Sequence, residues 1–244
     1  MINIKDFLFK IKEDLKQLFF YPQPDWGEDG KIDYNKYWMK RRPAGNLVGL
    51  SSWQKKRADL VLPFLSDGDI VVDIGGGGGE MLSYWQNQKK INGWCADFSQ
   101  LALAQARAKG LETIDLDLSD ISSLSNLPNC DFLTGFEVLE HLPNPEEFVL
   151  AVISKARKGL IFSFPNTGYY KHRLRLLFGC FPLQWVVHPG EHLRFWTVRD
   201  VRFWVKTLGL QLDKMILYEG LPFLSHLWPS LFGQGIIFFI SKEK

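Results

Sequence analysis

Residues 71–80 combine a short apolar run, an acidic residue and five consecutive glycines. Residues 70–74 have the composition of a buried parallel strand, and the glycines after them predict a tight turn into a helix. A turn without side chains lets a ligand lie against the backbone, close to the positive end of the following helix. The pattern therefore predicts a site for a nucleotide-like cofactor.

The spacing of the glycines shows which of the known types of nucleotide-binding turn the chain can form. The dinucleotide fingerprint G-x-G-x-x-G/A would put Glu80 or Met81 at its last position, where neither residue fits, and this disfavours a nicotinamide oxidoreductase. A phosphate-binding P-loop ends in Gly-Lys-Ser/Thr, whereas Gly79 is followed by Glu80. The spacing that the chain matches is D-x-G-x-G-x-G, formed by Asp73, Gly75, Gly77 and Gly79.

This motif resembles that of the class I S-adenosylmethionine-dependent methyltransferases. The resemblance implies that the cofactor is S-adenosylmethionine, bound by the motif acid and the glycines of the turn, namely Asp73, Gly75, Gly76, Gly77 and Gly79. A ribose bound at such a turn should meet a carboxylate at the end of the next strand. Asp97 stands there, 24 residues after Asp73, and we expect it to accept hydrogen bonds from the ribose hydroxyls. The open alternative is a surface aspartate that caps the helix starting near Ser99.

The same resemblance implies further cofactor contacts. Phe98 would lie beside the adenine, and Asp117 with Leu118 would meet its amine and ring edge, although a plain acidic loop is the alternative there. The predicted strand 131–136 ends at Phe136 and Glu137, which in the family face the methionine part of the cofactor and the acceptor.

The segment EVLEH places Glu137, Glu140 and His141 at positions i, i+3 and i+4, on one face if the segment is a helical turn. Methyl transfer needs alignment of nucleophile, methyl and leaving sulfur, but a hydroxyl acceptor must also lose a proton, for which histidine is suited. The segment resembles a motif of quinone O-methyltransferases and of enzymes of surface-glycan clusters. We expect His141 to be the general base and Glu140 to orient it. A divalent metal held by these three residues, as in the quinone enzymes, and a purely structural histidine remain open.

A second histidine pair lies further along the chain. His188 and His192 have helical spacing, but Pro189 and Gly190 prevent a helix between them, so we predict no zinc pair and no metal site. His192 is expected to line the acceptor pocket as a third catalytic residue, with Arg194 available for an acidic or phosphorylated substrate.

Strands and helices alternate from residue 64 to residue 164, which predicts a doubly wound parallel α/β sheet. A helix over 52–65 precedes it, and Thr197 with Asp200 forms a capping box for a helix to about residue 208. The resemblance implies a Rossmann-like, mostly parallel seven-stranded sheet with an antiparallel last strand, built from 70–74, 92–96, 112–116, 131–136, 159–164, 210–218 and 235–241.

We predict two domains, an N-terminal helical extension with a cofactor-covering segment (1–45) and the methyltransferase domain (46–244), whose residues 165–196 form a lid or acceptor insertion. Residues 2–21 have an apolar stripe at helical spacing, which favours docking on the chain itself or on a partner subunit, with a membrane surface as the alternative. Within the segment 33–42, Tyr37, Trp38 and Arg41 could cover the cofactor, or the segment could be a surface helix.

Residues 162–200 resemble the MetW-like methyltransferases of methionine biosynthesis, through an SFPN-x-G run, an Arg- and Leu-rich helix and a Trp-containing loop before F-x-T. The resemblance covers most of residues 57–213. The chain departs from that family in its N-terminal extension and in EVLEH, which stands where the family has a Gln-Thr-Leu-Gln type of sequence. Two functions follow: O-methylation of a small-molecule, glycan or lipid-linked acceptor, or a non-catalytic partner that regulates a homoserine acyltransferase.

Composition is consistent with one such domain and an extension. The chain has 244 residues, 46% of them hydrophobic, and its net charge of +2 is too small to indicate nucleic-acid binding. Its 3 cysteines, without a C-x-x-C pair, indicate neither a disulfide framework nor a thiolate metal site. No secretory signal and no run of 18 apolar residues is visible, so we expect a cytoplasmic protein of unknown oligomeric state.

Overall fold

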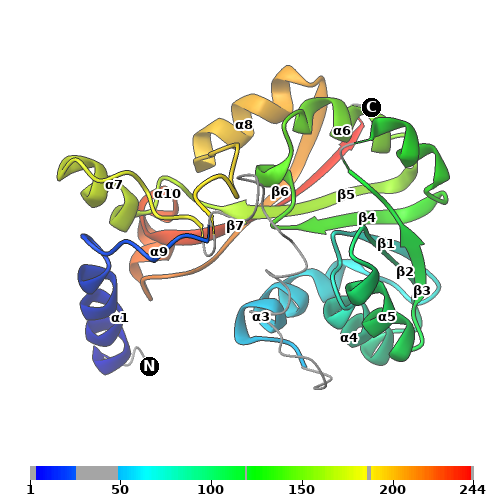
Figure 1. Ribbon diagram of the computed structural model, residues 1–244, viewed down its shortest axis with the longest axis horizontal. Helices are drawn as coiled ribbons and strands as arrows, with labels where there is room; N and C mark the ends of the chain where they lie inside the picture. Colours follow the sequence, from blue (N-terminus) through cyan, green and yellow to red (C-terminus); the bar gives the residue numbers. More distant parts are fainter. Residues whose placement is uncertain (1–3, 26–48, 119, 186–187, 243–244) are drawn as a thin grey trace.

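The computed structural model describes residues 4–25, 49–118, 120–185 and 188–242. These residues contain a seven-stranded sheet in the order β3-β2-β1-β4-β5-β7-β6 (Figure 1). All neighbouring strands are parallel except β7, which runs antiparallel to both β5 and β6. The predicted Rossmann-like fold is therefore confirmed. The strands are β1 (Ile70–Ile74), β2 (Asn92–Asp97), β3 (Glu112–Asp115), β4 (Cys130–Phe136), β5 (Ala156–Pro165), β6 (Leu210–Gly220) and β7 (Gly233–Lys242).

Helices cover both faces of this sheet (Figure 1). One face packs on α3 (Ser52–Val61), α4 (Glu80–Gln88) and α5 (Gln100–Ala108), and the other on α6 (Pro145–Val152) and α8 (Val198–Thr207). The central strands are buried on both sides, which explains why they are nearly continuous apolar runs.

Two predicted helix boundaries have clear local causes. The predicted capping box is present at α8, where the Thr197 side chain accepts from the backbone of Asp200 and the Asp200 side chain accepts from the backbone of Thr197. The helix predicted over 52–65 ends earlier, at Val61, and continues as a 3₁₀ turn that includes Pro63.

The strand register brings the chemistry-bearing residues to one edge of the sheet. Asp73 on β1 lies opposite Cys95 on β2 and opposite Thr134 on β4, so the carboxyl ends of three parallel strands meet around it. The chain order reverses between β1 and β4, because β2 and β3 extend the sheet on one side and β4 and β5 on the other. Ligands of open α/β sheets bind at such a switch point.

A separate group of helices lies at one end of the molecule (Figure 1). It comprises α1 (Ile4–Lys16), α7 (Tyr170–Leu177), α9 (Leu224–Leu227) and α10 (Pro229–Phe232). We call residues 4–25, 166–185 and 221–232 the end lobe. No helix among the described residues has the length and apolar composition to cross a bilayer.

Polar contacts dock α1 on its own chain, one of the two docking arrangements that the sequence favoured over a membrane surface. The buried Asp14 carboxylate accepts hydrogen bonds from the hydroxyls of Tyr169 and Tyr170 at 2.7 and 2.9 Å. The buried Arg175 guanidinium donates to the carbonyls of Gln17 and Leu18, both at 2.7 Å. The domain division at residue 45 stays a prediction, and Tyr37, Trp38 and Arg41 lie outside the described residues.

Candidate cofactor and acceptor site

The glycine turn has the backbone that its spacing predicts. Gly75, Gly77 and Gly79 have φ of 63°, 57° and 72°, in the left-handed region that glycine alone enters readily. A Cβ atom on Gly75 would lie 2.6 Å from a methyl of Val138, and one on Gly79 would lie 2.2 Å from a methyl of Leu111. The backbone conformation therefore requires glycine at all three alternate positions of D-x-G-x-G-x-G, and close packing requires it at Gly75 and Gly79 as well.

Asp73 lies buried beneath this turn, with 3% of its surface exposed. The Thr134 hydroxyl donates to its Oδ1 at 2.6 Å. Burial raises the pKa of the Asp73 carboxyl to about 7, and the nearby Asp97 and Glu80 carboxyls also act to raise it, whereas the Thr134 hydrogen bond and Arg57 act to lower it. Three acidic side chains so close together favour a positively charged ligand.

Asp97 lies at the carboxyl end of β2, and only 5% of it is exposed. Its Oδ2 accepts from the Gly77 amide and its Oδ1 from the Ser99 amide, both at 2.9 Å. Burial raises the pKa of this carboxyl above its usual value. The helix cap of α5 is the Ser99 hydroxyl, which accepts from the Ala102 amide, so the alternative of a surface aspartate capping that helix is wrong.

The residues expected around the adenine lie at the neighbouring ends of β2 and β3. Phe98 is 46% exposed, Leu118 is half-buried and Asp117 is exposed. The Leu116 amide donates to the Asp97 carbonyl at 3.1 Å, which holds the segment after β3 against the end of β2. Phe98 is thus an exposed aromatic face beside the glycine turn.

Phe136 and Glu137 end β4, but Glu137 does not share a helical face with Glu140 and His141. Its φ is 58°, and the following 3₁₀ turn begins only at Leu139, so the predicted arrangement of three residues on one face is wrong. The Phe136 ring, half-buried, lies with its centroid 5.9 Å from that of Trp85.

Glu137 instead belongs to a network of hydrogen bonds and an ion pair that its position in the sequence did not indicate. Its Oε1 accepts from the Ser163 hydroxyl at 2.9 Å and from the Tyr218 hydroxyl at 3.3 Å, and lies 3.1 Å from Nη1 of Arg57. Arg57 is 9% exposed, and its Nε has no hydrogen-bond partner among the described residues. The only sequence signal for Arg57 was its position on the same helix as the buried Ala58 and Val61.

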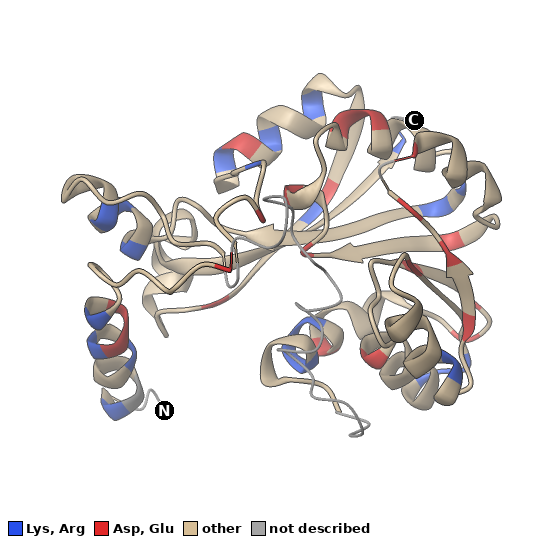
Figure 2. Cartoon of the chain, viewed as in Figure 1, with Lys and Arg blue, Asp and Glu red and all other residues tan. Residues whose placement is uncertain are grey.

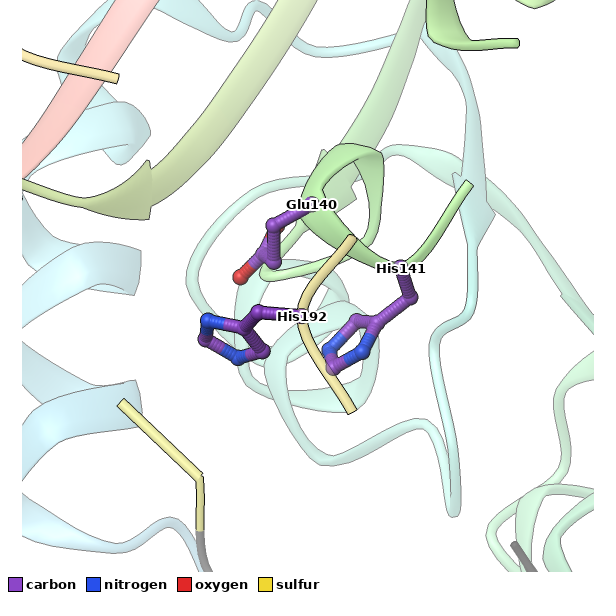
Figure 3. Close-up of side chains that lie close together, drawn as sticks. All are labelled: Glu140, His141 and His192. Atoms are coloured by element: carbon purple, nitrogen blue, oxygen red, sulfur yellow. The ribbon is translucent and has the colours of Figure 1, made fainter. Parts of the chain in front are cut away.

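Glu140, His141 and His192 come together from two distant segments (Figure 3). One potential ligand atom of each lies within 4.8 Å of the others. The two imidazole rings meet edge to face, with centroids 4.8 Å apart. His141 Nδ1 lies 2.5 Å from the Glu191 carbonyl, which can only accept, so Nδ1 carries the proton and the neutral ring has its lone pair on Nε2.

The Glu140 carboxyl is the most deeply buried group of this cluster. It is 1% exposed, and neither oxygen has a hydrogen-bond partner among the described residues. Burial, together with the negative charge of Glu137, raises its pKa well above the usual value. A carboxyl of this kind can orient an acceptor hydroxyl, or it can ionise beside a cation. One carboxylate and two imidazoles is also a donor set that divalent metals use.

Backbone hydrogen bonds hold the insertion against the 3₁₀ turn. The amides of Leu193 and Arg194 donate to the Glu140 carbonyl at 2.7 and 3.1 Å, which places His192 beside His141. The Arg194 guanidinium donates to the Pro143 carbonyl at 2.5 Å and lies 3.8 Å from Glu146. Its guanidinium is therefore bound at the surface of α6, whereas the sequence predicted that it would be available to an acidic or phosphorylated substrate.

Comparison with known families agrees with this geometry. The model of the family described as methionine biosynthesis protein MetW matches residues 55–240. The chain belongs to the MetW family. The match spans the glycine turn, EVLEH and the insertion with His192, whereas α1 precedes it. The search of curated proteins found no match.

Solved structures show that this MetW-family chain has the fold of S-adenosylmethionine-dependent methyltransferases. A SAM-dependent methyltransferase from Archaeoglobus fulgidus has a TM-score of 0.60 at 20% identity, covering 85% of this chain and 100% of its own. One from Geobacter sulfurreducens in complex with S-adenosylhomocysteine has a TM-score of 0.56 at 12% identity, covering 86% and 98%. A putative methyltransferase in complex with the Haloferax volcanii activator Trm112 scores 0.55 at 17% identity, covering 91% and 100%.

Proposed function

We propose that the chain binds S-adenosylmethionine at the glycine turn and transfers its methyl group to an oxygen of a small-molecule, glycan or lipid-linked acceptor. The observation that carries the proposal is the turn of three left-handed glycines between the buried carboxyls of Asp73 and Asp97. The Geobacter structure with S-adenosylhomocysteine, a protein of the same fold, supports it.

In this proposal the residues divide by the part of the cofactor that they meet. Asp97 accepts hydrogen bonds from the ribose hydroxyls, since a carboxylate has about four lone-pair sites and the backbone amides of Gly77 and Ser99 do not use all of them. Phe98 and the pair Asp117 and Leu118 border the adenine. The turn glycines, Gly76 included, allow the cofactor to approach the backbone.

The methionine part of the cofactor carries an ammonium and a carboxylate, for which opposite charges are needed. We propose that Asp73, Phe136 and Glu137 line this part of the site. The Arg57 guanidinium, buried beside Glu137 and with its Nε unpartnered among the described residues, is suited to the carboxylate.

S-adenosylmethionine supplies an electrophilic methyl group when it is bound. The chain has to align the acceptor oxygen and remove its proton. We propose that His141 accepts this proton at Nε2, because Nδ1–H is held by the Glu191 carbonyl. Glu140 and His192 lie in the same cluster, with one potential ligand atom of each within 4.8 Å of the others, and in this proposal they orient the acceptor hydroxyl.

Asp73 makes cofactor binding depend on pH. Its pKa of about 7, raised by burial, means that below this pH the unliganded protein holds a proton on the carboxyl. A cation bound beside it favours the ionised form, so binding releases the proton. The affinity for S-adenosylmethionine should therefore rise with pH, by at most about tenfold per pH unit, and level off above about pH 7.

Calorimetry at several pH values measures this rise. Asp73→Asn, of nearly the same shape, is the control, and its affinity should be lower and should lose the pH dependence near neutrality. An unchanged pH dependence in that variant would assign the titration to another group.

The proposed function is tested by titrating the full chain with S-adenosylmethionine and with NADH, and then by measuring release of S-adenosylhomocysteine with acceptor hydroxyl compounds. We expect saturable binding of S-adenosylmethionine only, and product release with at least one acceptor class. Preference for NADH would refute the proposal.

Membership of the MetW family supports a second candidate, a non-catalytic partner that regulates a homoserine acyltransferase in methionine biosynthesis. This candidate predicts that the chain co-purifies with the acyltransferase and releases no S-adenosylhomocysteine. The catalytic proposal predicts the reverse on both counts, so the two measurements separate them.

A further inference from the structure

Large apolar side chains on the surface are concentrated on the end lobe. Of the 21 exposed large apolar side chains among the described residues, 14 belong to three short segments of this lobe. Single exposed apolar residues are ordinary, but a concentration of this kind indicates an interaction surface. The 14 side chains are those of Ile4, Leu8, Phe9, Leu15, Phe19, Phe20, Tyr21, Leu176, Leu177, Phe178, Phe181, Phe223, Leu227 and Trp228.

Contacts between the segments make the end lobe one body. The rings of Phe19 and Phe178 lie 5.6 Å apart, which connects the end of α1 to the end of α7. The rings of Tyr170 and Phe232 lie 5.9 Å apart and connect α7 to α10. The segments that carry the exposed apolar side chains therefore pack against one another and are not independent loops.

When α1 docks on its own chain, part of its apolar stripe remains exposed to solvent. The docked edge is formed by Asp14 on the helix and by Leu18 just after its end, both buried. The flank next to that edge stays in solvent, with Ile4 69%, Leu8 58% and Leu15 49% exposed. The stripe is thus wider than the surface that the rest of the chain covers.

The charge of the end lobe is complementary to an anionic partner. Lys171 and Arg175 are buried inside the lobe and do not face a partner. Among the side chains that the structure describes, the exposed charged residues of the lobe are all basic, with Lys10, Glu13 and Asp25 half-buried; the exposed ones are Lys5, Lys12, Lys16 and Arg173. Figure 2 shows only basic residues among the charged residues of α7 and none of either sign on α9 and α10. On α1, Lys5 and Lys12 are exposed between the apolar residues, and Asp14 is buried inside the lobe.

We propose that the end lobe docks on the surface of an anionic lipid bilayer. Helices with exposed aliphatic and aromatic residues beside lysines bind in this way, because the apolar side chains enter the headgroup boundary while the ammonium groups remain at the lipid phosphates. Eight of the 14 exposed side chains are aromatic, the type enriched at membrane interfaces.

The surface is continuous in sequence with the acceptor site. The insertion that contains α7 and the exposed Phe181 continues to His192, which lies beside His141. The rings of Phe181 and Phe195 lie 5.5 Å apart and those of Phe195 and His192 lie 6.4 Å apart, so docking would hold this site close to the bilayer. Of the three acceptor classes in the proposed function, a site held at the bilayer favours the lipid-linked class. This choice of acceptor rests on the proposed function, whereas the contact with the bilayer is independent of it.

Vesicle flotation of the full chain tests the proposal. We expect flotation with vesicles of phosphatidylglycerol and phosphatidylcholine, weaker binding as salt is added, and little binding to phosphatidylcholine alone. The variant Leu177→Glu with Trp228→Glu changes two side chains that are 76% and 56% exposed. It should reduce binding at least about tenfold, since a charge replaces an inserted apolar group at two positions.

Phe203→Glu is the matched control, because Phe203 is 72% exposed on α8, outside the end lobe. It should float like the unmodified chain. All variants should bind S-adenosylmethionine equally in calorimetry, which reports folding and the cofactor site independently of the membrane. Absence of flotation by the unmodified chain, or equal loss in Phe203→Glu, would overturn the proposal. So would a dimer that the double variant dissociates, because the lobe would then be an interface between two copies.

Discussion

His141→Ala should lower turnover by about 10² to 10⁴-fold while the affinity for S-adenosylmethionine stays nearly unchanged, the range expected when a general base is lost. His141 is held for this role by the Glu191 carbonyl, which orients Nδ1 and leaves Nε2 as the acceptor. The measurement is release of S-adenosylhomocysteine with the acceptor identified by the function test. Phe203→Ala, at a side chain of α8 that is 72% exposed and outside the end lobe, is the control and should retain full activity.

The pH profile of the rate gives a second measure of the same role. A base must be unprotonated to accept the acceptor's proton, so the rate should fall as the pH is lowered through the range in which imidazoles titrate. This acidic limb should disappear in His141→Ala. Normal turnover by that variant on the true acceptor would leave alignment as the only catalytic contribution of the protein.

Chelation distinguishes catalysis that uses a divalent metal from catalysis by a general base without one. If a metal is used, a chelator should abolish activity and added Mg²⁺ should restore it. Glu140→Gln should then be as inactive as His141→Ala. The structure adds His192 to this test, because His192 lies in the cluster with Glu140 and His141, whereas Glu137 is paired with Arg57. Activity that is indifferent to chelation supports the general base.

Asp97→Ala should weaken S-adenosylmethionine binding by about 1 to 3 kcal/mol, or about 5- to 150-fold in Kd, because buried ribose hydroxyls would lose their acceptor. The Gly77 amide would lose its partner as well, so the turn itself should be less well ordered. Calorimetry measures the change.

Asp115→Ala provides the matched control for this prediction. Asp115 lies opposite Asp97 in the register of β2 and β3, but it is exposed and accepts a hydrogen bond from the Gln100 side chain. Its substitution should leave the affinity within about twofold, as for most surface changes. Equal affinity of Asp97→Ala and the unmodified chain would place the cofactor elsewhere.

Features that depend on local conformation could be predicted from the amino-acid sequence alone. Gly75, Gly77 and Gly79 could be assigned because a left-handed backbone is a property of single residues, and those three have it. The Thr197 and Asp200 cap could be assigned because its hydrogen bonds span three residues. The sheet followed from the alternation of apolar runs with helices, together with the resemblance to methyltransferases.

Contacts between distant side chains, in contrast, became visible only in the folded chain. The i, i+3, i+4 spacing of Glu137, Glu140 and His141 implied one face only if the backbone were helical throughout, and the φ of 58° at Glu137 breaks that condition. His192 reaches His141 because backbone amides of the insertion bind the Glu140 carbonyl, about 50 residues earlier, and no local pattern encodes such a contact. Likewise, Asp14 is buried because the hydroxyls of Tyr169 and Tyr170 compensate its desolvation, and that compensation exists only once α1 has packed on α7.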